Sequence, residues 1–564
     1  SCCFFLMLLA AAMACTQHLK QYTKQITTCG RDTRWHEALG LLSYMSTEDL
    51  APNVITFNAA INACQRGAQW QHGLGLLRDM RTQCVDPDVI TYNVAISACE
   101  KRARWQDALG VFADMGAECV EPDVITYNAM VSACEKGGRW HEALDMLADM
   151  RQSSIEPDVI SGNGAISACA RGGRWQEALG VFFDIQGGRI APDVYSYNAA
   201  ISACERGARW QEALYMFAGM RAAFVPPDDF SYNAAISALA RGARWQEALN
   251  KVWDMRRHEL VPDDLTFNAA MSACEKGAQW QHALAVFGAM PLGRVEPDDI
   301  SYNAAISACQ KGGRWREAFA LYASMRLRLL EADRITFNAA ISACEGGARW
   351  QDALDMISDM RQQHVQTDDI TFNAGINVCG KCARWQESLV LFRDMRTGHL
   401  EPDVIAHSAA INACVLGSQW HAALGMFMGA RLAHLEPNVV AYGSALRACE
   451  TGARWHEAMC LLSDLLSGHL RPSVRAYSYA MGACAGGGLW QEALATFSDM
   501  ERRGLELRAE TYSAAISACA TGAHWRDGLQ MLARMLPRRA DPGVATYAAA
   551  LAACAAGAQW QAAV

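Results

Sequence analysis

Residues 124–158 have the sequence VITYNAMVSACEKGGRWHEALDMLADMRQSSIEPD. The first half spaces its apolar residues along one face of a helix, and the glycines from Gly137 onward end that helix. The second half, from about Arg139 to Met150, repeats apolar residues at helical spacing and predicts a second helix. Pro157 then interrupts the chain before the pattern begins again. The stretch therefore predicts two helices joined by a tight turn.

The same pattern returns every 35 residues along the chain, and tryptophan marks it. Of the 17 tryptophans only Trp253 departs from this spacing. The others are Trp35, Trp70, Trp105, Trp140, Trp175, Trp210, Trp245, Trp280, Trp315, Trp350, Trp385, Trp420, Trp455, Trp490, Trp525 and Trp560. A fixed period of this length indicates a repeat array, in which each unit buries its apolar face against its neighbours.

Each of these tryptophans begins the predicted second helix and faces the first, so we expect it in the core of its own unit. We expect the arginine that precedes many of them to point to solvent, or else to a phosphate. Examples are Arg104, Arg139, Arg174 and Arg209.

The period also predicts the domain organisation. Residues 19–543 form fifteen tandem helical-hairpin repeats, and residues 544–564 form a truncated sixteenth. Residues 1–18 precede the array and begin with an apolar stretch without charges. This stretch is too short to span a bilayer comfortably. It is either a remnant of a targeting peptide or an apolar helix that caps the first repeat.

Composition excludes a generally basic surface. The chain has 50 Lys and Arg against 59 Asp and Glu, a net charge of −9. Nucleic-acid binding would therefore need a locally basic stripe. Of the 22 cysteines, fifteen recur at the 35-residue spacing from Cys29 to Cys554, with Leu239 as the one exception. Such positions are too far apart for disulfides, so we expect buried thiols in a reducing compartment.

No arrangement of residues typical of catalysis is found. The sequence has neither a glycine-rich phosphate loop nor a nucleophile elbow. Cys379 and Cys382 form a lone C-x-x-C without a second pair to complete a zinc site. We therefore expect no enzyme activity, no cofactor and no metal.

The string PDVITYNAAISACEKG, followed by EALxxFxDM, resembles the pentatricopeptide repeat family. It returns almost verbatim at residues 122–137, 192–207 and 297–312, and the resemblance covers about residues 19–564. The chain departs from the family at the tryptophan, where leucine is more usual. The resemblance implies an all-α, right-handed superhelical α-solenoid of helix-turn-helix hairpins. It also implies a single-stranded RNA binder in which each repeat recognises one base.

In the family the fifth and last residues of a repeat select the base. Ten consecutive repeats have asparagine at the fifth position and aspartate at the last. These predicted pairs are Asn58/Asp88, Asn93/Asp123, Asn128/Asp158, Asn163/Asp193, Asn198/Asp228, Asn233/Asp263, Asn268/Asp298, Asn303/Asp333, Asn338/Asp368 and Asn373/Asp403. An amide offers both a donor and an acceptor to a base edge, and a neighbouring carboxylate can hold its orientation.

In the family Asn with Asp favours uracil, with cytosine second. The flanking pairs Thr23/Asn53 and Ser408/Asn438 favour adenine. The predicted target is A, ten U and A, or a similar pyrimidine tract. Two alternatives remain: Asp after Pro is a good helix N-cap without any ligand, and near-identical repeats can arise by recent duplication.

The family's second position packs between adjacent bases. Here it is always apolar in the ten repeats: Ile55, Ile90, Ile125, Ile160, Tyr195, Phe230, Leu265, Ile300, Ile335 and Ile370. Position 13 is basic, which suits a phosphate backbone. The predicted phosphate contacts are Arg31, Arg66, Lys101, Lys136, Arg171, Arg206, Arg241, Lys276, Lys311 and Lys381, with a gap at Gly346.

Both columns change after about residue 403. Position 13 becomes uncharged from Leu416 onward, and the fifth and last residues drift to pairs such as Ser478 and Arg508. We therefore expect residues 19–438 to bind RNA, and the later repeats to be structural or to contact a protein partner.

The predicted function is sequence-selective single-stranded RNA binding in organelle RNA processing, stability or translation. By resemblance, the location would be a plastid or a mitochondrion, with no membrane association. The alternative is a protein-binding helical-repeat scaffold, which the net acidity favours. A scaffold, however, needs neither the Asn/Asp pairs nor the basic column at a fixed register.

Overall fold

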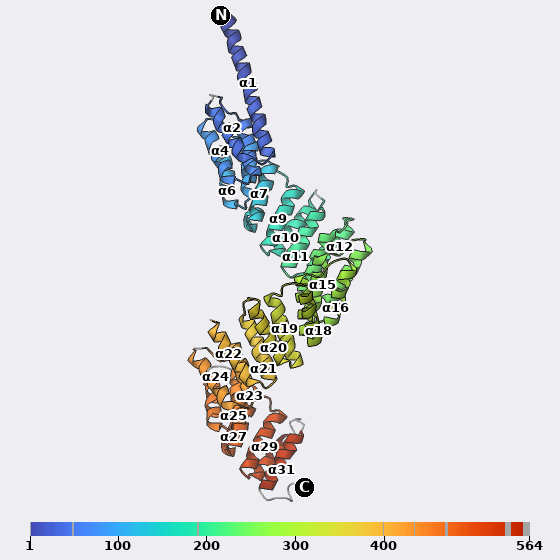
Figure 1. Cartoon of the computed structure of the whole chain (residues 1–564), viewed down its shortest axis with the longest axis vertical. Coiled ribbons are helices and arrows are strands. Elements are labelled where there is room, and N and C mark those ends of the chain that lie inside the picture. Colours follow the sequence, from blue (N-terminus) through green and yellow to red (C-terminus); the bar gives the residue numbers. More distant parts are fainter. Residues whose placement is uncertain are drawn as a thin grey trace. The chain divides into compact units, whose positions relative to one another are not determined.

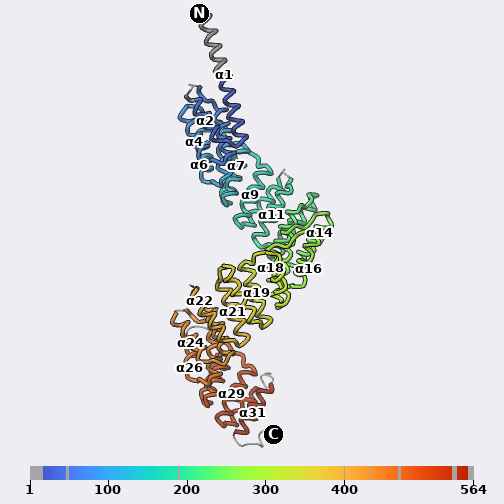
Figure 2. Tube along the Cα trace, in the orientation of Figure 1, coloured from blue at the N-terminus to red at the C-terminus, as the bar shows by residue number. Residues whose placement is uncertain are grey.

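The computed structural model describes residues 2–47, 50–188, 191–398, 400–433, 435–467, 472–535 and 543–556. Its secondary structure over those residues is 31 helices, which follow one another in antiparallel pairs (Figures 1 and 2). The chain divides into two compact units. The first comprises residues 1–279 with 288–296, and the second residues 280–287 with 297–564. The expected all-α fold of helical hairpins is confirmed.

Odd-numbered helices are the first helices of the hairpins, and even-numbered helices are the second. The first unit contains α1 (Cys2–Arg31), α2 (Trp35–Thr47), α3 (Val54–Arg66), α4 (Trp70–Thr82), α5 (Val89–Glu100), α6 (Trp105–Ala117), α7 (Val124–Lys136), α8 (Trp140–Gln152), α9 (Val159–Arg171), α10 (Trp175–Gly187), α11 (Val194–Arg206), α12 (Trp210–Ala222), α13 (Asp229–Arg241), α14 (Trp245–Arg257) and α15 (Asp264–Lys276). Helix α16 (Trp280–Leu292) has residues in both units.

The second unit continues the alternation. It contains α17 (Asp299–Lys311), α18 (Trp315–Leu327), α19 (Arg334–Gly347), α20 (Trp350–Gln362), α21 (Asp369–Lys381), α22 (Trp385–Thr397), α23 (Val404–Leu416), α24 (Trp420–Leu432), α25 (Val439–Thr451), α26 (Trp455–Ser467), α27 (Val474–Gly486), α28 (Trp490–Arg502), α29 (Ala509–Thr521), α30 (Trp525–Met535) and α31 (Val544–Ala556).

Helix α1 runs from Cys2 to Arg31 without a break at residue 18. The described residues contain no helix with both the length and the apolarity needed to cross a membrane. Whether residues 1–18 derive from a targeting peptide stays a prediction.

Capping explains where the first helices begin. In α7, the Asp123 carboxylate accepts a hydrogen bond from the backbone N–H of Thr126, and the Thr126 hydroxyl accepts one from the N–H of Asp123. Nine first helices, from α5 to α21, have this capping box. It satisfies donors that a helix N-terminus otherwise leaves unpaired.

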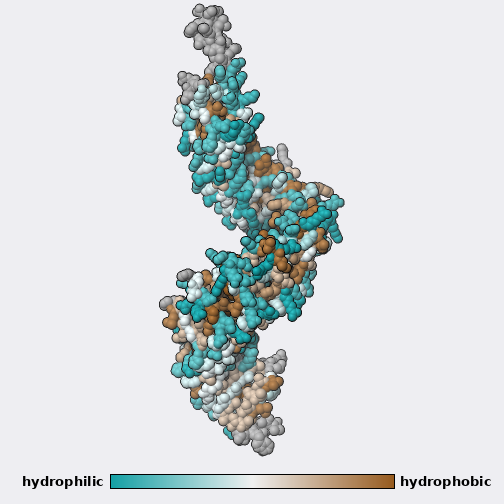
Figure 3. All heavy atoms as spheres, viewed as in Figure 1, coloured by the Kyte–Doolittle hydropathy of each residue, from teal (hydrophilic) through white to brown (hydrophobic). Residues whose placement is uncertain are grey.

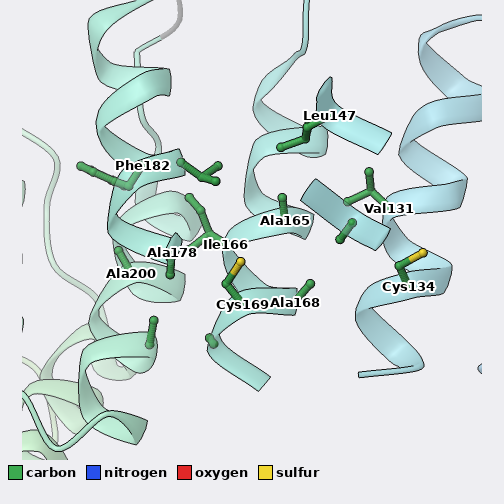
Figure 4. Packing of buried hydrophobic residues seen from close by; sticks show 14 of the residues in the cluster. Val131, Cys134, Leu147, Ala165, Ile166, Ala168, Cys169, Ala178, Phe182 and Ala200 are labelled. Carbon is green, nitrogen blue, oxygen red and sulfur yellow. The ribbon is translucent and has the colours of Figure 1, made fainter. Parts of the chain in front are cut away.

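Packing supplies the rest, because isolated helices of this length are marginal in water. Within each unit, successive first helices contact one another and their own second helices. Figure 4 shows Val131 of α7, Ile166 of α9 and Phe182 of α10 in one buried cluster. Small side chains such as Ala168 and Cys169 of α9 are buried in this packing.

The described cysteines are free thiols. Those at the 35-residue spacing are buried, as the sequence predicts for small apolar residues. Burial raises the pKa of the Cys99, Cys204 and Cys344 thiols to about 12, so they stay protonated at neutral pH.

The tryptophans are less buried than expected. Trp70 and Trp140 are partly buried and pack against the core of the first unit. Trp175 is half-buried and also packs on the next repeat. A Cβ atom added at Gly207 would lie 2.5 Å from Cδ1 of Trp175. Gly207 has φ −76°, so the glycine is required by this close approach and not by its backbone angle. The left-handed residue of the turn is Ala208, at φ 53°.

The arginine that precedes many of the tryptophans is partly exposed, as expected, with the Arg209 side chain at 45%, but it also has protein partners that the sequence did not predict. The Arg209 guanidinium lies 4.6 Å from the centre of the Trp175 ring and forms an ion pair with Glu212 at 2.7 Å. The same stacking joins Arg104 to Trp70, Arg139 to Trp105 and Arg174 to Trp140. We call the contact of a tryptophan with the glycine and arginine of the following repeat the Trp–Gly joint.

Candidate nucleic-acid interface

A groove of about 890 Å³ in the first unit brings three of the predicted columns together. Its walls come from the first helices α7, α9, α11 and α13. The lining includes Asn128, Asn163, Asn198, Asp193, Asp228, Ile160, Tyr195, Phe230, Arg171 and Arg206. Predicted base-reading, base-packing and phosphate-contacting residues therefore share one surface.

Apolar residues at the second position of each first helix are exposed. All ten predicted members are exposed, from Phe230 at 58% to Tyr195 at 75%. Ile405 and Val440 extend this apolar row at 58% and 65%. The prediction missed these two, although their position within the repeat is the same. Figure 3 shows apolar patches within a largely hydrophilic surface. Exposing large aliphatic side chains at a fixed register has no use in folding, because the hydrophobic effect favours their burial.

Each asparagine of the ten pairs lies on a first helix, and its aspartate caps the next first helix. Eight of the ten pairs are joined by a hydrogen bond from Asn Nδ2 to the Asp carboxylate, at 3.0–3.2 Å. They are Asn58/Asp88, Asn93/Asp123, Asn128/Asp158, Asn163/Asp193, Asn198/Asp228, Asn233/Asp263, Asn303/Asp333 and Asn338/Asp368. Each of these aspartates therefore caps a helix and holds an amide, so helix capping and a role in base reading are compatible.

A third side chain fixes the amide orientation. The Thr91 hydroxyl lies 2.6 Å from Asn58 Oδ1 and 2.7 Å from an oxygen of Asp88. Equivalent hydroxyls approach the asparagine oxygen of five further pairs. They belong to Thr126, Ser231, Thr266, Thr336 and Thr371. An amide held this way retains one N–H and one oxygen lone pair for a ligand. The sequence analysis missed this column, although Thr or Ser follows three residues after nine of the ten aspartates.

The aspartates of the ten pairs differ in exposure. Asp228 and Asp333 are exposed, whereas the other eight are half-buried. Asp333 still caps α19 and accepts from Asn303 Nδ2 at 3.1 Å. That distance is the same as in the half-buried pairs, such as Asn93 with Asp123 at 3.1 Å, so exposure does not separate the aspartate from its amide.

The oxygen Oδ1 has no protein partner in Asn128, Asn163 or Asn373. Ser161, which could serve Asn128, instead donates to the Asp158 backbone carbonyl and carboxylate. Ala406 stands where Asn373 would need a hydroxyl. Buried oxygens without a partner are costly, and a ligand donor would satisfy them.

Hydrogen bonding also affects the charge of the aspartates. Burial alone would raise the pKa of Asp88, but hydrogen bonds from Thr91 and Asn58 outweigh burial and lower the pKa. The same balance lowers the pKa of Asp123, Asp193, Asp228, Asp263 and Asp368. These carboxylates therefore remain acceptors well into the acidic range.

Two of the ten predicted pairs and the two flanking pairs remain. Asn268 belongs to the first unit and Asp298 to the second. Asp403 caps α23 through the N–H of Ala406. Of the flanking pairs, Thr23 donates to the Leu19 carbonyl at 2.7 Å, and Ser408 lies 3.5 Å from Asn438 Oδ1.

The predicted phosphate contacts are exposed at the ends of the first helices, but several have an acidic partner that the prediction missed. Glutamate at position 12 pairs with the cation of the following repeat. The pairs are Lys136–Glu100 at 2.7 Å, Arg171–Glu135 at 3.4 Å, Arg241–Glu205 at 3.7 Å and Lys381–Glu345 at 2.8 Å. We call these glutamates the acidic row. Burial raises the pKa of Glu135 and Glu205, although the neighbouring cations oppose this.

No group of three or more His, Cys, Asp or Glu side chains among the described residues could hold a metal ion. Cys382 donates to the Ala348 carbonyl at 3.2 Å, and Cys379 is buried.

Comparison with known families agrees with the repeat. The pentatricopeptide repeat domain profile matches residues 18–66, 181–242, 249–314, 390–451 and 496–556. The PPR repeat family profile matches residues 87–136, 122–171 and 297–346, and the PPR repeat profile matches residues 163–190, 230–260, 370–399 and 475–505. No curated protein matches the chain.

Solved structures share the fold at low sequence identity. The crystal structure of the pentatricopeptide repeat protein PPR10 from maize is 19% identical, covers 96% of this chain and 92% of its own, and has a TM-score of 0.62. PPR10 in complex with an 18-nt psaJ RNA element is 20% identical over 97% of this chain and 83% of its own, with a TM-score of 0.56. Together the profiles and the helical-hairpin solenoid show that this chain belongs to the pentatricopeptide repeat family.

Proposed function

We propose that the chain binds single-stranded RNA along its first helices, one base per repeat, with a preference for a uridine-rich pyrimidine tract. The observation that carries the proposal is the alternation of exposed apolar side chains with oriented amides in one groove. Ile160, Tyr195 and Phe230 are exposed, and Asn163 and Asn198 lie between them along the lining. PPR10, which shares the fold, is solved in complex with an 18-nt RNA element.

Each element of the groove has a separate task in this proposal. The apolar side chains pack against the faces of successive bases, which contributes affinity with little selectivity. The amide meets the Watson–Crick edge with its remaining donor and acceptor, which contributes selectivity. The carboxylate and the hydroxyl hold the amide, so little side-chain entropy is lost on binding. The chain acts by occupying RNA, without a catalytic step of its own.

The finer terms of the proposal follow the family. They are the base that each pair of residues selects, a target of A, ten U and A, and a role in the RNA processing, stability or translation of a plastid or mitochondrion. RNA contact is assigned to residues 19–438. The later repeats, whose groove lacks the amides, are assigned a structural role or a protein partner.

Fluorescence anisotropy of the full chain with labelled rU12, rC12 and rA12 tests the proposal. We expect rU12 to bind most tightly, rC12 next and rA12 least. Equal affinity for all three would contradict base selection while retaining RNA binding. Absence of binding to any of them at low salt would support the protein-binding scaffold instead.

A further inference from the structure

The cations of position 13 fall into two classes according to the residue one repeat earlier. Where position 12 is glutamate, the cation of the next repeat forms an ion pair, as in Arg241 with Glu205. Where position 12 is uncharged, the cation of the next repeat forms no ion pair within the described part of the chain. These unpaired cations are Arg66, Lys101, Arg206 and Lys276, and the residues before them are Gly30, Gln65, Ala170 and Ala240. Arg31, in the first repeat, also forms no ion pair there.

The glutamates are well placed to compete with a phosphate. Side chains of Glu100, Glu135 and Glu205 are 20%, 19% and 23% exposed, so their carboxylates are largely shielded from water. Glu135 and Arg171 both line the groove that contains Asn163. A phosphate that took Arg171 from Glu135 would leave a shielded carboxylate without its partner, beside an anionic strand.

Further hydrogen bonding holds one of these pairs in place. Oε1 of Glu100 accepts from Lys136 Nζ and from the Ser132 hydroxyl, each at 2.7 Å. Ser132 and Lys136 lie on the same helix, α7, and Glu100 ends the preceding first helix, α5. The paired cations therefore connect neighbouring repeats, whereas Arg206 and the other unpaired cations are exposed and have no such task.

We propose that the acidic row restricts phosphate contact to the unpaired cations, so that these, and not the whole basic column, anchor the RNA backbone. This inference rests on the proposed function, since it concerns how the same groove holds RNA. The glutamates act as position-specific negative elements, which lower affinity for any polyanion while leaving the contacts to the bases untouched.

Salt dependence gives the first test. For a single strand the slope of log K against log salt is about −0.7 per phosphate contact, so the five unpaired cations predict a slope of roughly −3.5 and all ten basic residues roughly −7. Anisotropy of the full chain with rU12 over a salt series measures it. A slope near −7 would overturn the proposal.

Matched charge variants give the second test. Glu205→Gln frees Arg241 for a phosphate and should raise rU12 affinity roughly threefold to tenfold and steepen the salt slope. Glu212→Gln removes the same charge from the same repeat, at the Arg209 pair outside the groove, and should change neither. Thermal unfolding of both variants verifies that they are folded. Equal affinities for the two variants would overturn the inference.

Two arginines give the third test. Arg206→Ala should weaken rU12 binding roughly threefold to tenfold, whereas Arg241→Ala combined with Glu205→Gln, which removes the pair without leaving an unpaired carboxylate, should have little effect. Equal losses would again contradict the division of the row. RNA binding with no difference inside either matched set disproves this inference alone. Failure of the wild-type chain to bind any RNA disproves the proposed function as well.

Discussion

Two grooves on first helices share a backbone design and differ in what they offer a ligand. The groove in the first unit presents Asn163 and Asn198 between exposed apolar side chains. The groove near the end of the second unit, of about 930 Å³, presents Ser478 and Ser513 instead, with Arg475 and Glu510 at the second position. Its lining also includes Tyr479, Arg447 and Glu450.

Residues that hold the repeats together do not change between the two grooves. Tyr197 and Cys204 of α11 are buried, and so are Tyr477 and Cys484 of α27. Gly207 lies against Trp175 in the first unit, as Gly522 lies against Trp490 in the second. Fold and ligand chemistry are therefore encoded at separate positions of the repeat, and one can diverge while the other stays constant.

The strongest test of this contrast compares two double variants. One removes two amides from the first groove, and the other removes the two serine hydroxyls at the same repeat position in the second groove. Asn163→Ala with Asn198→Ala should reduce rU12 affinity about a hundredfold, because each amide contributes roughly 1–1.5 kcal/mol. Ser478→Ala with Ser513→Ala should leave rU12 affinity unchanged. Anisotropy measures both, and a comparable loss in the serine variant would remove the distinction between the grooves.

Stability should show the opposite result, with both regions affected alike. Gly207→Ala and Gly522→Ala each place a methyl group within 2.5 Å of a tryptophan ring atom. Each should lower the free energy of unfolding by about 1–3 kcal/mol, since overpacking displaces its neighbours. Gly180→Ala is the control, because its Cβ meets nothing within 4 Å. Calorimetric melting temperatures check this, and a loss at only one of the two joints would contradict a shared scaffold.

A graft should give the second unit part of the chemistry of the first. Arg475→Ile, Ser478→Asn and Arg508→Asp together recreate the apolar residue, the amide and its carboxylate, and Thr511 already supplies the hydroxyl. Arg508 has no side-chain capping bond, so aspartate there should also stabilise α29 by about 1 kcal/mol. We expect roughly fivefold tighter binding of a longer oligouridine, rU18, with no gain for rA18. Tighter binding of both would indicate a charge effect and not base recognition.

Acid should strengthen binding slightly, through the first groove alone. Burial raises the pKa of Glu135 and Glu205, whereas the aspartates at the amides have lowered pKa values. As pH falls from about 7.5 to about 5.5, these glutamates gain protons first and release Arg171 and Arg241. We expect roughly twofold to threefold tighter rU12 binding, which the double variant Glu135→Gln with Glu205→Gln should abolish. An unchanged pH dependence in that variant would place its origin elsewhere.

Local patterns were sufficient to predict the hairpins, the period and the capping aspartates. Asp158 followed by a helical apolar pattern predicts a helix start from neighbouring residues alone. The packing of Trp175 on the next repeat was not predicted, because apolar periodicity indicates that a side chain is buried but not which repeat buries it. Lys136 and Glu100 are 36 residues apart, and only the stacking of α7 on α5 brings them into contact.

The amide geometry could be predicted only in part. The Asn and Asp columns are visible in sequence, and their roles were taken from the family resemblance. The contact between Asn58 and Asp88 could be anticipated, since a carboxylate can orient an amide. The hydroxyl of Thr91 was not anticipated, because a residue already assigned to a capping box gives no signal of a second partner.

The Trp–Gly joint has a consequence for how such a chain can change length. Twelve of the tryptophans within the described residues, Trp175 among them, lie against a glycine of the following repeat, so the structural unit runs from one tryptophan past the next turn. An in-frame duplication or deletion of 35 residues among these repeats again places a tryptophan beside the glycine of the unit that follows it. Recombination between misaligned gene copies would therefore change the length of the chain and keep the contacts between its repeats.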